Sequence, residues 1–367
     1  MKKNIAIVAN SNNLYSETFI QAHKSINANV FFYYSGLIPE KLENYGSLYT
    51  NSFKNIILKS YYRIFKNQGV SGYFFKKSLK KYKIDTVLAE FGTNAANIMD
   101  VCKKINMPLV AYFFGFDAYK TDVLTEYNIK YKDLFDYCKA IMVVSLDMKE
   151  QLISLGCDVN KIVYSPCAPN DAFFQVKPTF KEPRSFIALG RFVNKKSPDS
   201  TILAFRQVVK KYPDAKLYFG GNGILEEVAK RLVNYFNLNA NVEFIGVQSQ
   251  AEYIGYYSKV AGFIQHSITA EDGDKEGTPV AVLEASLAGL PIISTMHAGI
   301  PEVVINGETG FLVKENDIDA MANAIIYLIE NPERAKLMGA KGRDFVNQNF
   351  SMRSHLEILE NTLSCNG

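Results

Sequence analysis

The strongest constraint on the fold is an alternation between short apolar runs and amphipathic stretches, which occurs in both halves of the chain. In the first half, the apolar runs are rich in β-branched and aromatic residues: Ile5–Ala9, Val30–Tyr34, Thr86–Ala89, Leu109–Phe113 and Ile141–Val144. Such short, almost continuously apolar strands are typical of a parallel sheet buried on both faces. Helical patterns lie between them, at Asn94–Lys104 and Asp147–Leu155. The alternation predicts right-handed strand–helix–strand units and a doubly wound α/β sheet.

The second half repeats the pattern and predicts a second sheet of the same type. Its predicted strands are Ser185–Leu189, Lys216–Phe219, Val242–Ile245, Gly262–Gln265 and Pro291–Ser294. Its predicted helices are Thr201–Lys211, Leu225–Phe236, Ala281–Ala288 and Asp319–Ile329. Ligands of doubly wound domains bind at the carboxyl ends of the strands. Two such domains that face each other therefore predict a cleft between those ends.

The length of 367 residues suits two domains better than one core. Prolines at 166, 169, 178 and 183 interrupt a segment without periodicity, which indicates a linker. We therefore predict an N-terminal Rossmann-like domain at residues 1–168 and a linker at 169–184. A C-terminal Rossmann-like domain follows at 185–350, and a last helix at 351–367 is free to cross back to the first domain.

Composition and charge narrow the class of protein. Hydrophobic residues make up 48% of the chain and charged residues 21%, and no run approaches the roughly 18 apolar residues of a membrane-spanning helix. Five scattered cysteines without a C-x-x-C pair argue against a disulfide framework or a zinc site and favour a cytoplasmic location. Residues 1–168 carry a net charge of +7 and the remainder −3. Nine cations and no acid lie between Asn44 and Ile84.

This basic stretch has two interpretations. It is either an ordinary solvated helix face or a surface that contacts an anionic membrane peripherally, at the inner face of the membrane. No nucleic-acid motif accompanies the charge, so we expect no nucleic-acid partner.

The segment from Glu271 to Val303, EDGDKEGTPVAVLEASLAGLPIISTMHAGIPEV, carries the most chemical information. Gly277, Thr278 and Pro279 open a predicted helix, with Pro279 at its first position and Thr278 as its cap. A helix N-terminus presents free N–H groups and the positive end of a dipole, which suits a phosphate. Glu276 before the turn and Glu284 within the helix place two carboxylates near that point, where they suit the hydroxyls of a sugar and a ribose.

A second informative segment follows the first strand of the second half. Gly190 permits a sharp turn after that strand. Arg191 and Lys196 then bring two cations to the predicted cleft, enough to neutralise a diphosphate leaving group.

Together these segments carry a resemblance. G-R-x-x-x-x-K at Gly190 and E-G-x-x-x-x-x-x-E at Glu276, about 85 residues apart, resemble the retaining GT-B glycosyltransferases of family 4. The acidic EDGDKEGTPVAVLEA version is most similar to the branch that builds bacterial exopolysaccharides and colanic acid. The resemblance is strong over residues 185–350. It implies a GT-B fold of two facing Rossmann-like domains, an N-terminal acceptor domain, and a nucleotide-sugar donor bound mainly by the C-terminal domain.

The resemblance also implies roles for individual residues. Arg191 and Lys196 would hold the diphosphate, Glu276 would meet the transferred sugar, and these three are the predicted catalytic residues. The other predicted donor-binding residues are Gly190, Gly221, Gly246, Gly277, Thr278, Pro279 and Glu284. Gly221 and Gly246 lie where such enzymes contact phosphate and base with their backbone.

In the first half the resemblance is weaker. Ser16-Glu17-Thr18-Phe19-Ile20 is similar to the S-E-T-F-I of the family, and Phe114-Gly115-Phe116-Asp117 to its H-G-x-D. Ser16, Glu17, Thr18 and Asp117 are the predicted acceptor-side residues. Phe114 stands where many relatives carry a histidine, so the imidazole expected near the donor sugar is absent there. His266 and His297 are the best-placed substitutes, and ordinary packed or solvated histidines are the simpler interpretation.

A metal-dependent glycosyltransferase, a dehydrogenase, a binding subunit and an epimerase are the alternatives to this interpretation. Asp272-Gly-Asp274 imitates the D-x-D metal motif of the other common glycosyltransferase fold, but two cations make a metal redundant, so we predict no metal and no cofactor. The glycines at 220–223 do not form the G-x-G-x-x-G of a dehydrogenase. A non-catalytic nucleotide-sugar-binding subunit and a GT-B-fold epimerase remain as rivals.

The prediction is retaining transfer of a sugar from a nucleoside diphosphate sugar to a glycan or lipid-linked acceptor, in surface polysaccharide or glycan assembly.

Overall fold

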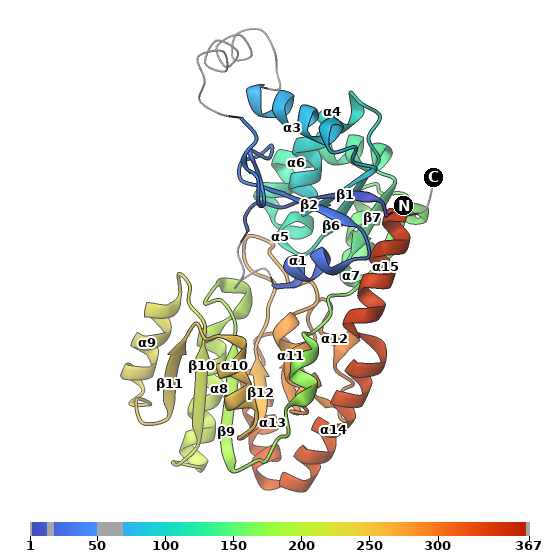
Figure 1. The fold of residues 1–367 in the computed structure, drawn as a ribbon. Helices are drawn as coiled ribbons and strands as arrows, with labels where there is room; N and C mark the ends of the chain where they lie inside the picture. Colours follow the sequence, from blue (N-terminus) through green and yellow to red (C-terminus); the bar gives the residue numbers. More distant parts are fainter. Residues whose placement is uncertain (1, 13–17, 50–68, 365–367) are drawn as a thin grey trace. The chain divides into compact units, whose positions relative to one another are not determined.

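The computed structural model describes residues 2–12, 18–49 and 69–364, and the chain divides into two compact units (Figure 1). The first unit comprises Met1–Ser165 and His355–Gly367, and the second comprises Pro166–Ser354. Residues 169–184, which we predicted as a linker, group with the second unit, where they include the short helix η3 (Asp171–Gln175) and the start of a strand. Among the described residues, no helix is both long and apolar enough to cross a membrane.

The first unit is built on an eight-stranded sheet in the order β4-β3-β2-β1-β5-β6-β7-β8. The strands are β1 (Asn4–Val8), β2 (Asn29–Tyr34), β3 (Lys41–Leu42), β4 (Gly46–Ser47), β5 (Thr86–Glu90), β6 (Leu109–Phe113), β7 (Ala140–Val143) and β8 (Ile162–Tyr164). All neighbouring strands pair in parallel except β2 with β3 and β3 with β4, which pair antiparallel. The prediction omitted β3, β4 and β8, because two or three residues are too few to show periodicity. The strand order reverses between β1 and β5.

Helices connect the strands of the first unit. They are α1 (Thr18–Ala22), η1 (His23–Ser25), α3 (Gly69–Lys81), α4 (Gly92–Lys103), α5 (Phe116–Tyr119), α6 (Thr121–Tyr137), α7 (Leu146–Ser154) and η2 (Val159–Lys161). α4 buries most of its residues because alanine and apolar side chains face the sheet, and it packs on β6 and α6.

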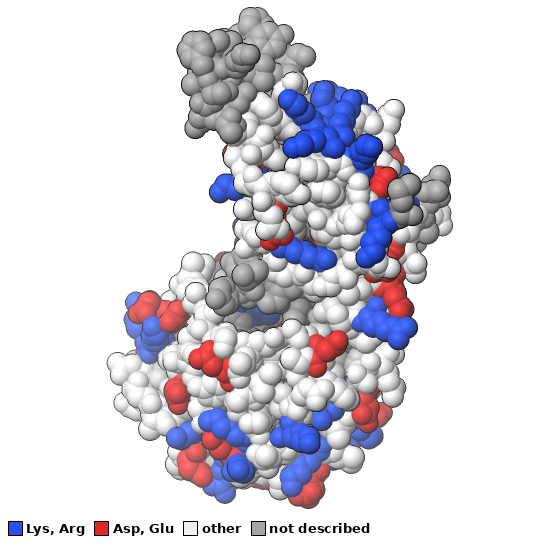
Figure 2. All heavy atoms as spheres, viewed as in Figure 1, with Lys and Arg blue, Asp and Glu red and all other residues white. Residues whose placement is uncertain are grey.

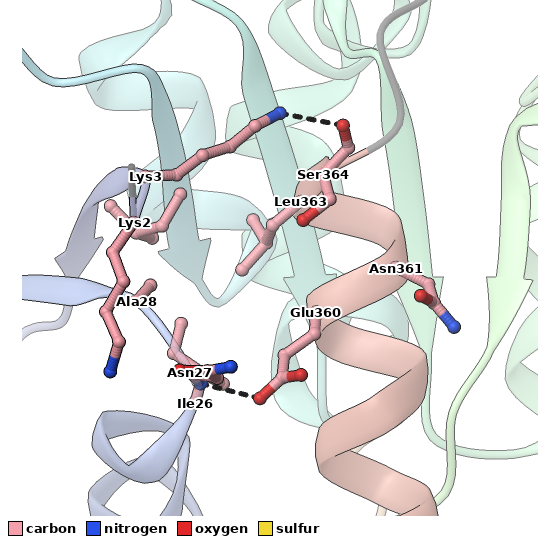
Figure 3. Close-up of a pocket in the computed structure, with 10 residues that line it drawn as sticks. Lys2, Lys3, Ile26, Asn27, Ala28, Glu360, Asn361, Leu363 and Ser364 are labelled. Atoms are coloured by element: carbon pink, nitrogen blue, oxygen red, sulfur yellow. Dashed lines mark hydrogen bonds between the residues drawn. The ribbon is translucent and has the colours of Figure 1, made fainter.

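The C-terminal helix α15 (Met352–Ser364) completes the first unit. Near its start, His355 Nε2 lies 2.9 Å from His23 Nε2, and His23 Nδ1 lies 2.7 Å from the buried Glu90 carboxylate. At its other end, Lys3 Nζ donates to the Ser364 carbonyl at 2.7 Å, and Glu360 accepts the Asn27 N–H at 2.6 Å (Figure 3). The helix is therefore part of the first unit's core and edge.

The second unit contains a six-stranded parallel sheet in the order β11-β10-β9-β12-β13-β14. Its strands are β9 (Glu182–Leu189), β10 (Lys216–Gly220), β11 (Val242–Gly246), β12 (Val260–Gln265), β13 (Ile292–Thr295) and β14 (Gly310–Val313). This order, 3-2-1-4-5-6 within the unit, is that of the Rossmann fold. The topological switch point lies between β9 and β12, and ligands of such sheets bind beside it, outside the carboxyl ends of the strands.

Helices cover both faces of this sheet (Figure 1). They are η4 (Asn194–Lys196), α8 (Pro198–Lys211), α9 (Glu226–Tyr235), α10 (Gln250–Tyr257), α11 (Val280–Leu287), α12 (Ile300–Val303), α13 (Ile318–Glu330) and α14 (Pro332–Asn349). α8, α9 and α13 share one hydrophobic core with the strands, whereas α11 packs against α14. α8 begins at Pro198, whose fixed φ suits the first turn of a helix. It ends at Lys210 and Lys211, whose positive charges interact favourably with the negative end of the helix dipole. The predicted doubly wound α/β fold is confirmed for both units.

Candidate active site

Two glycine-containing turns pack backbone on backbone at the carboxyl ends of β9 and β10. A Cβ on Gly221, which has φ +129°, would lie 1.9 Å from the Gly190 carbonyl oxygen. The Gly190 N–H donates to the Gly220 carbonyl at 3.1 Å, and the Phe192 N–H to the Asn222 carbonyl at 2.8 Å. The Gly221 N–H in turn donates to the Gly246 carbonyl at 2.8 Å, so three strand ends are linked. Only glycine fits Gly221, and the turn that carries Arg191 is fixed as a result.

Lys196 and Glu276 meet at the switch point. Lys196 Nζ lies 2.9 Å from Glu276 Oε1, and the two side chains are 15% and 8% exposed. The lysine stem runs along Gly190, and a small pocket beside it is lined by Gly190, Arg191, Lys196 and Gln265. The sequence predicted both residues as catalytic but not that they pair, since 80 residues separate them.

This ion pair is electrostatically coupled. Burial alone would raise the pKa of the Glu276 carboxyl, but the ammonium groups of Lys196 and Lys195 outweigh burial and hold the pKa at about 2. For Lys196, burial lowers the pKa, and the Glu276 carboxylate opposes that effect. Each charge therefore helps the other to remain ionised in a buried place.

Arg191 differs from Lys196 in being exposed, and its side chain makes no hydrogen bond or ion pair with any other described residue. Its positive charge is close enough to oppose the charge of Lys196. Two neighbouring cations, one exposed and one buried, make this edge of the sheet suitable for an anion with several charges.

The helix that follows Glu276 begins one residue later than we predicted. α11 starts at Val280, and Pro279 is its N-cap, with φ −71° and ψ 113°. The prediction that Pro279 is the first helical residue was therefore wrong, because its ψ is extended. Pro279, and not Thr278, is the N-cap, and its own side chain makes no capping hydrogen bond. The N–H groups of Val280 and Ala281 in the first turn have no intrahelical acceptor, as at any helix start. Gly277 and Thr278 precede them as buried residues, and the Gly277 carbonyl accepts the Gly299 N–H at 3.2 Å.

Glu284 lies in the second turn of α11, and its carboxyl group has no hydrogen-bond or ion-pair partner among the described residues. Burial raises the pKa of its carboxyl to about 8. Its charge also contributes, after burial, to raising the pKa of Tyr253 and Tyr257 on α10. A carboxyl group without a partner beside a helix N-terminus is suited to bind hydroxyl groups of a ligand.

Glu284→Gln should stabilise the protein at alkaline pH. The folded state keeps a proton that the unfolded chain releases above about pH 4.5, so wild-type stability falls as pH rises towards about 8. Glutamine imitates the neutral carboxyl, so we expect the variant to melt at least about 3 °C higher than wild type near pH 9, and at a similar temperature near pH 5. Calorimetry at both pH values measures the difference, with the exposed Glu243→Gln as control. An equal loss of melting temperature at both pH values would contradict this prediction.

The two histidines considered as substitutes for the absent imidazole are both buried and occupied. His297 Nε2 accepts the Glu276 N–H at 3.1 Å, and its Nδ1 lies 2.6 Å from the Glu315 carboxylate. His266 Nε2 accepts the Asn316 N–H at 3.0 Å, and burial lowers its pKa to about 4. His266 packs inside the second unit, whereas His297 fixes the backbone of Glu276. The sequence did not assign His297 this supporting role.

The acidic loop before Glu276 is contacted by a further residue, on η4, that sequence analysis missed. Lys195, only 7% exposed, pairs with Asp274 at 2.9 Å, so Asp274 of the D-x-D-like segment already has a cationic partner. Among residues 2–12, 18–49 and 69–364, no group of three or more His, Cys, Asp or Glu side chains is arranged to hold a metal ion. Metal independence stays a prediction.

The predicted acceptor-side residues belong to the first unit. Ser16 and Glu17 lie outside the described residues, and Thr18 is the first residue of α1. Asp117 is completely buried: its carboxylate accepts the N–H groups of Gly92 at 2.8 Å, Gly115 at 2.9 Å and Phe114 at 3.1 Å. Asp117 therefore holds the turns after β5 and β6 together. Because its carboxylate is buried, it can influence a ligand only by fixing the position of these turns.

Phe114, in the position where relatives carry histidine, belongs to an aromatic cluster. Its ring centroid lies 4.4 Å from that of Tyr112, 4.6 Å from Phe19 and 5.2 Å from Phe91. A phenyl ring suits this apolar surrounding, in which an imidazole would need polar partners.

Comparison with known proteins agrees with this geometry. Residues 169–345 match the family described as "Glycosyl transferases group 1". The amylovoran biosynthesis glycosyltransferase AmsK of Erwinia amylovora is 28% identical over 289 residues, which cover 77% of this chain and 71% of AmsK. The putative colanic acid biosynthesis glycosyltransferase WcaL of Escherichia coli is 29% identical over 279 residues, 74% of this chain and 68% of WcaL.

Solved structures show the same fold. Anabaena Alr3699/HepE, crystallised with UDP and glucose, superposes with a TM-score of 0.76 at 15% sequence identity, and the match covers 99% of both chains. Structural neighbours of this kind have the GT-B architecture, in which two Rossmann-like domains are joined in one chain. The matched segment contains the turn of Arg191, the Lys196–Glu276 pair and α11. Residues 169–345 are thus a glycosyltransferase group 1 domain, and the chain that contains it has the GT-B architecture.

Proposed function

We propose that this glycosyltransferase moves a sugar from a nucleoside diphosphate sugar to a hydroxyl of a glycan or lipid-linked acceptor, with retention of configuration, in surface polysaccharide assembly. The observation that carries the proposal is the buried Lys196–Glu276 pair at the switch point of a Rossmann sheet, with Arg191 and the start of α11 beside it. AmsK and WcaL, which are named for amylovoran and colanic acid biosynthesis, support the assignment to polysaccharide assembly.

In this proposal the second unit stabilises the leaving group. As the bond between the sugar and the diphosphate breaks, negative charge grows on the diphosphate oxygens. Arg191, Lys196 and the free N–H groups at the start of α11 stabilise that charge through preorganised donors. Glu276 meets the transferred sugar, and Glu284 accepts hydrogen bonds from the ribose. Glycine backbone at Gly190, Gly221 and Gly246 leaves room for the nucleotide. Two cations supply the neutralisation that a metal supplies in other glycosyltransferases, so we propose that no metal or other cofactor takes part.

A donor screen tests this proposal. The purified protein is incubated with UDP-glucose, UDP-galactose, UDP-N-acetylglucosamine and GDP-mannose, and release of UDP or GDP is measured with and without EDTA. We expect release from one or two of these donors, unchanged by EDTA, and NMR of the product should show the anomeric configuration of the donor. Nucleotide binding without release would instead indicate a binding subunit. Conversion of the sugar on an intact donor would indicate an epimerase, and loss of activity restored by Mn²⁺ would indicate a metal site.

We further propose that the first unit contacts an anionic membrane at its cytoplasmic face, where a lipid-linked acceptor would lie. Lys76, Lys77, Lys80 and Lys81 lie on α3, spaced one turn apart in two adjacent rows, while Phe75 and Leu79 on the same helix are buried. Figure 2 shows Lys and Arg side chains gathered over this part of the first unit. A cationic row of this kind suits an anionic lipid surface.

Replacing these four lysines with glutamine should weaken sedimentation with phosphatidylserine liposomes. Each engaged lysine contributes about 1 kcal/mol at such a surface, and the contribution falls with salt as the Debye length shortens to about 3 Å at 1 M. Release of UDP or GDP from the donor in solution should stay unchanged. The matched control replaces four exposed lysines of the second unit, Lys210, Lys211, Lys216 and Lys336. If the wild-type protein does not sediment with these liposomes at low salt, the lysines form only a solvated face.

A further inference from the structure

The loop between β12 and α11 is a compact turn that delivers Glu276 to the site. The Gly273 N–H donates to the Ala270 carbonyl at 2.9 Å, and the Ala270 N–H to the Asp274 carbonyl at 3.0 Å. The Asp274 N–H donates to the Asp272 carboxylate at 3.2 Å, and Gly273 takes φ +81° to close the turn. The inference below rests on the proposed role of Glu276, which follows this turn by two residues.

Lys195 holds this turn from the β9 side. Its Nζ lies 2.9 Å from Asp274 Oδ1 and donates to the Lys275 carbonyl at 2.8 Å. Its own carbonyl accepts the Ile268 N–H at 2.9 Å, at the start of the same loop. One residue therefore binds the loop at three places, and its side chain is only 8% exposed.

Glu276 is held from the opposite side as well. The Glu276 N–H donates to His297 Nε2 at 3.1 Å, and His297 is oriented by Glu315, whose carboxylate also accepts the Thr269 N–H at 2.9 Å. Lys195 and His297 thus fix the two flanks of the residue that pairs with Lys196.

The positive charge of Lys195 has an effect beyond its contacts with the loop, because it offsets repulsion between two carboxylates. Asp274 and Glu276 are two residues apart, and without a cation between the loop and β9 their negative charges would repel each other. Lys195 and Lys196 are adjacent in sequence, and each pairs with one of these carboxylates. The arrangement therefore consists of two neighbouring ion pairs, Lys195–Asp274 and Lys196–Glu276. Only the second pair is among the groups proposed to meet the donor.

We propose that Lys195 is a positioning residue for glycosyl transfer: its ammonium is a built-in counter-cation that holds the Asp272–Glu276 loop so that Glu276 and Lys196 stand ready for the donor. It supplies from within the protein the positive charge that a divalent metal supplies to a D-x-D motif. Its side chain contacts the loop, and its effect on the reaction passes through Glu276.

Lys195→Ala tests the proposal by separating turnover from nucleotide binding. We expect kcat with the donor found in the screen to fall by about 10- to 100-fold, since small misplacements of reacting groups carry costs of this size. The Kd for UDP or GDP alone, measured by calorimetry, should change less than about threefold, because the Lys195 ammonium is bound to Asp274 and the Lys275 carbonyl and is not among the groups proposed to meet the donor. Added propylammonium should restore part of the lost turnover by occupying the vacated place, whereas tetramethylammonium, which has no N–H donor, should not.

Removal of a buried cation can also unfold the protein, so a second variant keeps the test decisive. Lys195→Met with Asp274→Asn removes both charges and leaves no buried carboxylate without a partner. This double variant should fold and still lose turnover, while Lys195→Arg should retain more activity than Lys195→Ala. Lys211→Ala, which breaks an exposed ion pair with Glu330, is the matched control and should be unaffected by either amine.

The outcomes distinguish this inference from the proposed function. If Lys196→Ala loses turnover but Lys195→Ala and the double variant behave as wild type, the proposed function stands and Lys195 has no positioning role. If Lys196→Ala itself retains wild-type turnover, the proposed site is wrong whatever Lys195 does. Equal losses of turnover and nucleotide affinity in Lys195→Ala, without rescue by propylammonium, would mean a general structural role.

Discussion

Arg191→Ala and Lys196→Ala should each lower turnover by about a hundredfold or more. Both side chains lie at the carboxyl end of β9, and their charges act most strongly when the diphosphate leaves. Arg191 is exposed and has no partner among the described residues, so its loss should leave the melting temperature unchanged. Steady-state kinetics with the donor from the screen measures kcat, and calorimetry checks the fold.

The matched control for Arg191 is an exposed arginine within β9, the strand that Arg191 follows. Arg184 pairs with Asp214 at 2.7 Å, away from the site. Arg184→Ala should change turnover less than about twofold, as expected for an exposed ion pair. Wild-type turnover in both Arg191→Ala and Lys196→Ala would remove these residues from the mechanism.

Glu276→Gln should lower turnover by about a hundredfold near neutral pH, and the deficit should shrink as pH falls. Burial lowers the pKa of Lys196, and the Glu276 carboxylate is the charge that opposes this effect. Without that carboxylate the pKa of Lys196 falls further, so the lysine loses its proton at lower pH than in the wild-type protein. Lowering the pH restores the ammonium and with it part of the turnover.

The pH dependence of kcat for wild type and variant measures this effect. The loss that remains at low pH reports the direct contact of Glu276 with the sugar, and the part that recovers reports its support of Lys196. Glu276→Asp keeps the charge and is the control, so its deficit should not depend on pH. A wild-type to Glu276→Gln ratio that stays constant with pH would show that Lys196 keeps its charge without Glu276.

Much of the fold could be predicted from the sequence because it depends on local patterns. Runs such as Leu109–Phe113 and Val242–Ile245 predicted strands that the structure confirms within one residue. The short strands β3 and β4 could not be predicted, since two residues carry no periodicity. α14 was also not among the predicted helices. It contains many charged residues and two glycines, so its apolar stripe is narrow.

The candidate site shows the same division between local and distant information. Spacing identified Arg191, Lys196, Glu276 and Glu284, because each follows a recognisable turn or helix start. The pairing of Lys196 with Glu276 could not be predicted, nor that of Lys195 with Asp274 across 79 residues, because these side chains meet only after the sheet has formed. Nor could the sequence reveal that Asp117 is buried against backbone N–H groups, since one of them, that of Gly92, lies 25 residues away along the chain. Position along the chain predicts which residues reach the edge of the sheet, and folding determines which of them touch.

The return of α15 to the first unit has a consequence for the order in which the protein is made. Residues 166–354 form a contiguous unit, which can fold as soon as they have left the ribosome. The first unit is synthesised earlier, but it lacks His355 and the rest of α15 until residue 364 emerges. Until then the buried pair of His23 and Glu90 has no contact with α15. The unit that is synthesised second therefore completes its fold first, and a nascent chain halted before residue 355 would display a finished second unit attached to an unfinished first one.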